Sequence, residues 1–106
     1  MGFFDRLRRP DINQGIVEFG TVPGALLLDV RSRSEYANGH IPGSRNLPLK
    51  EIDTVEELAA DKGASIFVYC QSGGRSSRAK RELQSLGYSD VRDLGGINFY
   101  TGELEK

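Results

Sequence analysis

The fold is decided by one apolar stretch and the turn that follows it, Ile66-Phe67-Val68-Tyr69-Cys70 and Gln71-Ser72-Gly73-Gly74-Arg75. The first part is short and rich in β-branched and aromatic residues, which is typical of a strand covered on both faces. The two glycines allow a sharp change of chain direction. A helix is expected to begin near Arg75 and to end at Gly87, with its buried face marked by Ala79, Leu83 and Leu86. We therefore predict a strand, a loop and a helix in direct succession.

A similar succession occurs nearer the N-terminus. The apolar run 25–28 follows Pro23-Gly24 and leads into Asp29, which predicts a second covered strand over residues 25–30. Apolar residues after Asp11 have the spacing of one helical face, and Gly20 is placed where a left-handed C-cap would fall. After the strand, Ser32 and Glu35 have the spacing of a capping box, which predicts a short helix that stops near residue 39.

The remaining elements complete an alternating pattern. Thr54 and Glu57 form a second candidate capping box, short strands are expected near residues 46–47 and at Val91, and a turn or helix follows Gly96. Strands alternating with helices predict an α/β fold, with a mainly parallel central sheet and helices on both faces. Ligands in such sheets bind beyond the carboxyl ends of the strands. Residues 29–31 and 70–76 follow the two best strands directly and are therefore the candidate site.

Length and composition limit the function classes. The chain has 106 residues, 38% of them apolar and 27% charged, with a formal net charge of −1. We expect one soluble domain over residues 11–106, preceded by an arginine-bearing segment, residues 1–10, that is either a flexible tail or an oligomer contact. The balanced charge argues against a nucleic-acid partner. Apolar runs of only a few residues argue against a membrane span.

Cysteine and histidine occur once each, as Cys70 and His40. A single cysteine forms no internal disulfide, and the pair does not make a zinc site, so no metal is expected. The N-terminal residues lack the apolar core and cleavage site of a secretory signal. These observations together predict a protein that works in the reducing cytoplasm.

The chemistry is predicted to centre on Cys70. Gly73 and Gly74 allow successive N–H groups to turn inward, and the start of the following helix adds unpaired N–H groups. Such a cradle, with the cation of Arg75 beside it, binds an anion and favours a reactive thiolate. A lone cysteine after a strand is more often a small buried apolar residue, but the succession of parts favours the chemical interpretation. No lysine follows the glycines, so a nucleotide-binding P-loop is a poor match.

Three separated motifs resemble those of a single-domain rhodanese, a sulfurtransferase. The resemblance runs from about Asp11 to Thr101 and rests on three stretches: Leu28-Asp29-Val30-Arg31 with Glu35-Tyr36 and Gly39-His40-Ile41-Pro42-Gly43-Ser44; the loop from Cys70 to Arg75; and Leu94-Gly95-Gly96-Ile97 with an aromatic residue soon after.

The resemblance implies a persulfide mechanism without metal or cofactor. Cys70 would take a sulfane sulfur from a small anionic donor such as thiosulfate and pass it to cyanide, a thiol or a protein acceptor. The substrate would be bound by the loop residues, largely through backbone N–H groups, and by Arg75, which would meet the donor's oxyanion; the binding residues are Gln71, Ser72, Gly73, Gly74, Arg75 and Ser76.

Other charged residues have a predicted supporting role. Asp29, Arg31 and Glu35 are interpreted as an ion-pair network beside the strand end, and Arg31 is a candidate to assist an anion. The resemblance favours an architectural role for His40 over that of a catalytic base. The basic stretch of Arg75, Arg78, Lys80 and Arg81 is either a solvated helix face or a positive field that attracts anionic donors.

Two other functions compete with sulfur transfer. A non-catalytic binding module of the same fold would need neither Cys70 nor Arg75. Cysteine phosphatases of related fold place five residues between cysteine and arginine, whereas only four separate Cys70 from Arg75 here, so the loop is expected to be too small for a phosphate ester. An arsenate reductase is disfavoured as well, because no second cysteine could resolve the intermediate.

Overall fold

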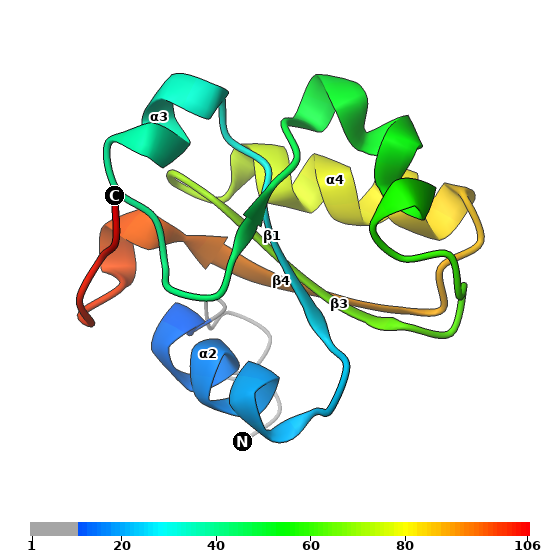
Figure 1. Ribbon diagram of the computed structural model, residues 1–106, viewed down its shortest axis with the longest axis horizontal. Helices are drawn as coiled ribbons and strands as arrows, with labels where there is room; N and C mark the ends of the chain where they lie inside the picture. Colours follow the sequence, from blue (N-terminus) through cyan, green and yellow to red (C-terminus); the bar gives the residue numbers. More distant parts are fainter. Residues whose placement is uncertain (1–10) are drawn as a thin grey trace, which may run out of the picture.

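Four parallel strands run through the middle of the molecule in the order β2-β1-β3-β4 (Figure 1). The computed structural model describes residues 11–106, so the prediction for residues 1–10 lies outside the described part. The elements, in chain order, are α2 (Ile12–Thr21), β1 (Leu26–Asp29), α3 (Arg33–Ala37), β2 (Arg45–Asn46), the 3₁₀ helix η1 (Leu49–Glu57), β3 (Ser65–Cys70), α4 (Gly74–Ser85), β4 (Asp90–Gly96) and the 3₁₀ helix η2 (Ile97–Phe99). The α/β fold with a parallel sheet is confirmed.

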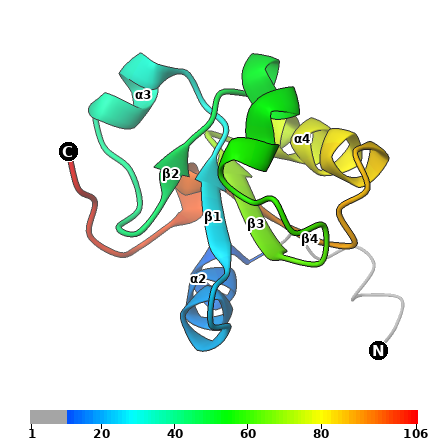
Figure 2. The ribbon, with the colours of Figure 1, turned by 45° about the vertical axis from the view of Figure 1, so that its right-hand side comes forward.

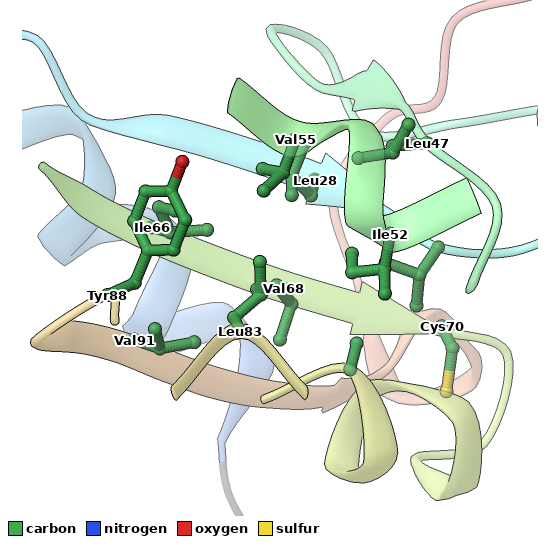
Figure 3. Close-up of a cluster of buried hydrophobic side chains, with 12 residues drawn as sticks. Leu28, Leu47, Ile52, Val55, Ile66, Val68, Cys70, Leu83, Tyr88 and Val91 are labelled. Atoms are coloured by element: carbon green, nitrogen blue, oxygen red, sulfur yellow. The ribbon is translucent and has the colours of Figure 1, made fainter. Parts of the chain in front are cut away.

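Helices cover both faces of the sheet, as predicted. Figures 1 and 2 show α2 on one face and α4 with η1 on the other. Successive side chains of β3 alternate between these faces because a strand has a period of two residues. Ile66, Val68 and Cys70 pack in the cluster under α4 and η1 (Figure 3), whereas Phe67 and Tyr69 pack in the cluster under α2. All five side chains are buried.

The N-terminal caps of two helices follow the sequence closely. The Asp11 carboxylate accepts hydrogen bonds from the backbone N–H groups of Asn13 and Gln14 at the start of α2. Ser32 and Glu35 form the predicted reciprocal capping box at the start of α3. This box fixes the direction in which the chain leaves the carboxyl end of β1, and it places Glu35 beside the candidate site.

Three local predictions are wrong. Gly20 is not a left-handed cap: α2 continues to Thr21, and the C-cap is Val22 in an extended conformation. Thr54 does not begin a helix, because η1 already begins at Leu49 and the Thr54 hydroxyl donates to the carbonyl of Glu51 within it. Leu86 is the C-cap of α4 and is 38% exposed, so the buried face of that helix ends at Leu83.

Within residues 11–106, no helix has the length and apolar character needed to cross a membrane.

Candidate active site

The segment that carries Cys70 lies at the carboxyl edge of the sheet. Cys70 is the last residue of β3, residues 71–73 form the turn, and α4 begins at Gly74. Gly73 precedes the helix with φ of 113°, a left-handed conformation that side-chain-bearing residues rarely adopt. The predicted strand, loop and helix are therefore present, and the glycine makes the turn possible.

The Cys70 sulfur has polar contacts although it belongs to the core. The residue is 1% exposed and packs with the apolar side chains under α4, at the end of the row shown in Figure 3. Its Sγ accepts a hydrogen bond from the N–H of Gly73 at 3.0 Å. As a thiol it also donates to the hydroxyl of Ser76 at 3.5 Å. The sequence predicted successive inward-pointing amides, and the Gly73 N–H is the one that bonds to the sulfur within the described residues.

Ser76 lies behind the sulfur and not at the mouth of the loop. The residue is fully buried in the first turns of α4, and its hydroxyl donates to the carbonyls of Gly73 at 3.1 Å or Gly95 at 3.4 Å. A hydroxyl can rotate and exchange partners. Once Cys70 has lost its proton, the same hydroxyl can donate to the thiolate, so Ser76 is placed to stabilise a negative sulfur.

Residues at and after the third motif, Leu94-Gly95-Gly96-Ile97, pack against the Cys70 turn. A Cβ atom added to Gly96 would come within 2.5 Å of the Gln71 carbonyl oxygen and 2.7 Å of the Ser72 Cα, so only glycine fits there. The N–H of Asn98 donates to the Gln71 carbonyl at 3.1 Å, and the side chains of the two residues also bond to each other. Sequence reasoning recognised the glycines as a motif without assigning them this support, and it missed Asn98, which carries no sequence signal.

Arg31 and Asp29 form a buried ion pair that contacts the loop at Gln71. Their side chains are 5% and 0% exposed, and the Arg31 Nη2 lies 2.7 Å from the Asp29 Oδ2. The Arg31 guanidinium also donates to the Gln71 side-chain carbonyl at 3.1 Å and to the Gly39 carbonyl at 2.7 Å. The pair thus links the end of β1 to the residue that follows Cys70, in agreement with a supporting role.

Arg75 and Glu35 form a second pair, at the residue with which the loop leads into α4. The two Nη atoms of Arg75 lie 2.7 and 2.9 Å from the two carboxylate oxygens of Glu35. The hydrogen bond from Arg75 is the largest cause that lowers the pKa of Glu35 to about 2, and the same bond raises the pKa of Arg75. The predicted network of Asp29, Arg31 and Glu35 is therefore two separate pairs, and Arg75, predicted to face the donor, has a carboxylate partner.

The other residues of the turn are less enclosed. Gln71 is half-buried, whereas Ser72 and Gly74 are exposed at the tip, so the turn is accessible above the buried sulfur. A hollow of about 300 Å³ lies beside the turn, with Arg31, Glu35, Gln71 and Ile97 in its wall. One residue of each ion pair, Arg31 and Glu35, therefore lines this hollow.

His40 has structural contacts. Its ring stacks on Tyr36 with 3.7 Å between ring centroids, and its Nδ1 lies 2.9 Å from the Tyr36 carbonyl oxygen. The backbone of His40 pairs with that of Glu105 in an isolated bridge. Of the predicted basic stretch, Arg78 lies 3.5 Å from Glu82 and Arg81 donates to Ser77, so these cations interact along their own helix. Within residues 11–106, no cluster of three or more His, Cys, Asp or Glu side chains could hold a metal ion.

Comparison with known proteins identifies relatives of this arrangement. Residues 13–103 match the family model described as a rhodanese-like domain. The chain is 37% identical over 71 residues to thiosulfate sulfurtransferase PspE of Escherichia coli, a match that covers 66% of this chain and 68% of the relative. It is 32% identical over 80 residues to the adenylyltransferase and sulfurtransferase uba4 of Ogataea parapolymorpha, covering 74% of this chain but only 21% of that longer protein.

A solved structure extends the likeness to three dimensions. The structure titled "rhodanese with anions from E. coli" superposes with a TM-score of 0.72 at 32% identity, covering 77% of this chain and 98% of the other. The likeness in sequence and the likeness in fold are therefore to the same group of proteins. The chain belongs to the rhodanese-like domain family, among whose members are sulfurtransferases.

Proposed function

We propose that this protein is a sulfurtransferase that carries sulfur as a persulfide on Cys70. The observation that carries the proposal is the hydrogen bond from the Gly73 N–H to the Cys70 sulfur, at the start of a helix and beneath an accessible turn. A donor aimed at a sulfur stabilises the negative charge that the sulfur bears before and after transfer.

The reaction has two strokes. The Cys70 thiolate attacks the outer sulfur of a donor such as thiosulfate, a new S–S bond forms, and the S–S bond of the donor breaks with its electron pair leaving on sulfite. A thiophilic acceptor, which is cyanide, a thiol or a protein thiolate, then attacks the outer sulfur of the persulfide. The electron pair of that bond returns to the Cys70 sulfur. Both strokes are covalent catalysis and consume no external oxidant or reductant.

The turn supplies the binding groups in this proposal. Gln71, Ser72, Gly73 and Gly74 would hold the transferred sulfur and the donor through their backbone N–H groups, with the Ser76 hydroxyl behind the Cys70 sulfur. Asp29 and Arg31 would act indirectly, because they fix the side chain of Gln71. Arg75 would meet the oxyanion of the donor at the rim. Losing a single oriented donor of this kind costs about 10²-fold in rate in comparable sites.

The donor and the compartment are part of the proposal. A small anionic donor suits a turn of N–H groups, and the similar rhodanese of E. coli, solved with anions, supports this choice. We place the reaction in the cytoplasm, since Cys70 is the only cysteine of the sequence and an unpaired thiol is kept reduced in that compartment.

Intact mass spectrometry after incubation with thiosulfate tests the proposal. The wild-type protein should gain one sulfur, about 32 Da, that a reducing agent removes, and Cys70→Ala should gain none. Production of thiocyanate from thiosulfate and cyanide extends the test to turnover. If neither thiosulfate nor an organic persulfide adds sulfur, the chain is a non-catalytic binding module. If the protein instead hydrolyses p-nitrophenyl phosphate faster than it turns over thiosulfate, the result supports the phosphatase alternative.

A further inference from the structure

The two arginines beside the Cys70 turn differ in what they can offer a ligand. The buried guanidinium of Arg31 donates hydrogen bonds to Asp29, Gln71 and Gly39. Arg75 bonds to Glu35 with side chains that are 40% and 33% exposed. Arg75 follows the turn in sequence and lies in the first turn of α4, next to Gly74. Arg75 is therefore the cation that an incoming anion could reach, provided that Glu35 gives it up.

We propose that Glu35 is a positioning residue that sets the affinity for anionic sulfur donors, because its carboxylate competes with the donor's oxyanion for the guanidinium of Arg75. This inference rests on the proposed sulfurtransferase function and adds a determinant of donor binding to it. In the free protein the two Nη atoms of Arg75 bond to the two carboxylate oxygens of Glu35. When a donor binds, its oxyanion takes the place of the Glu35 carboxylate on the guanidinium.

The surroundings of Glu35 make this exchange feasible. Its Oε1 accepts hydrogen bonds from the backbone N–H of Ser32 at 2.9 Å and from the Ser32 hydroxyl at 3.0 Å. These bonds belong to the capping box of α3 and do not depend on Arg75. When the guanidinium turns to a donor, the carboxylate keeps two hydrogen-bond donors and contact with solvent. The buried Asp29 has no such freedom, since losing Arg31 would leave its charge in the interior.

Competition predicts that removing the charge of Glu35 strengthens donor binding. Glu35→Gln keeps the size of the side chain and an oxygen for the capping box, which accepts Glu or Gln at this position. It weakens the hold on Arg75. We expect the KM for thiosulfate to fall about two- to five-fold with kcat unchanged, a range set by the strength of partly exposed ion pairs.

A matched control separates this effect from net charge. Glu51→Gln removes one negative charge and one ion pair from the same side of the molecule, because Glu51 bonds to Arg33 of α3 at 2.6 Å. That variant should leave the KM within experimental error of wild type. Combining Glu35→Gln with Arg75→Ala should abolish the gain, since no guanidinium is left to release.

Two further readouts keep the test decisive. The dissociation constant of sulfite, measured by calorimetry on the resting protein, should fall by a similar factor in Glu35→Gln, whether or not turnover occurs. The melting temperature should fall slightly in the same variant, so that affinity and stability move in opposite directions.

Each outcome separates the two proposals. A wild-type protein that gains no sulfur overturns the proposed function, while the sulfite titration still decides the role of Glu35. Unchanged or weaker binding of both anions in Glu35→Gln shows that Glu35 only stabilises the fold. A gain that also appears in Glu51→Gln, or that persists without Arg75, shows a general charge effect. Any of these last results overturns the inference.

Discussion

Two arginine–carboxylate pairs adjoin the Cys70 turn, and they share their chemistry and differ in exposure. Arg31 and Asp29 are almost completely buried, whereas Arg75 and Glu35 are each exposed by a third or more. Taking charges out of water is costly, so a buried pair is tolerated only when its hydrogen bonds are satisfied. An exposed pair contributes little to stability and can exchange partners. The comparison teaches that the buried pair is a fixed support of the turn and the exposed pair is an adjustable contact.

The largest effect is expected from a substitution that breaks the buried pair of Arg31 and Asp29. Asp29→Asn leaves the Arg31 charge in the interior without its partner, and we expect the free energy of unfolding to fall by about 3–5 kcal/mol. Urea denaturation monitored by circular dichroism measures this change. Glu35→Gln is the matched variant on the exposed side, with an expected loss of about 1 kcal/mol or less. Equal losses in the two variants would mean that burial does not distinguish the pairs.

The second prediction concerns the close approach of Gly96 to the backbone of the Cys70 turn. Gly96→Ala places a methyl group against the backbone of Gln71 and Ser72, and we expect a loss of about 1–3 kcal/mol together with a displaced turn. Sulfur loading of Cys70, followed by intact mass, should slow even at temperatures where the variant is folded. Gly20→Ala is the control, because nothing lies within 4 Å of its added Cβ. Normal loading by Gly96→Ala would show that the turn does not depend on this contact.

The smallest effect is a pH dependence of the stability that the exposed pair of Arg75 and Glu35 contributes. The pKa of Glu35 is lowered from 4.5 to about 2, chiefly by its bond to Arg75. A lowered pKa means that the carboxylate contributes stability above pH 4.5 and loses that contribution as the pH falls toward 2. The stability difference between wild type and Glu35→Gln, about 1 kcal/mol or less, should therefore shrink over this window. A difference that stays constant from pH 6 to pH 2 would contradict the pairing.

The sequence predicted the sheet and the position of Cys70 at the end of a buried strand because both depend on local patterns. The apolar runs before Asp29 and Cys70 indicated strands, and Ser32 with Glu35 indicated a cap. Thr54 with Glu57 has the same spacing and misled, since the chain was already turning from Leu49 and the Thr54 hydroxyl bonded back into that turn. Spacing alone does not reveal where a helix has already begun.

The partner of Arg75 depends on the tertiary fold. Glu35 and Arg75 are 40 positions apart in sequence, and they meet because β1 and β3 are parallel neighbours whose carboxyl ends share an edge. Both charged residues are visible in the sequence, but the prediction grouped Glu35 with Arg31, which is nearer to it along the chain. Similarly, the close approach of Gly96 to the turn follows from the pairing of β3 with β4, where Cys70 lies opposite Gly96 after a shift in register.

The alternation of side chains along β3 determines which face of the sheet carries the Cys70 thiol. Cys70 shares a face with Val68 and Ile66, two and four positions earlier, and that face carries α4 and the Gly73 amide. Tyr69 belongs to the opposite layer. Gaining or losing one residue within the strand would reverse this parity and turn the thiol toward α2, far from any amide of the turn, without altering a single residue of the loop itself.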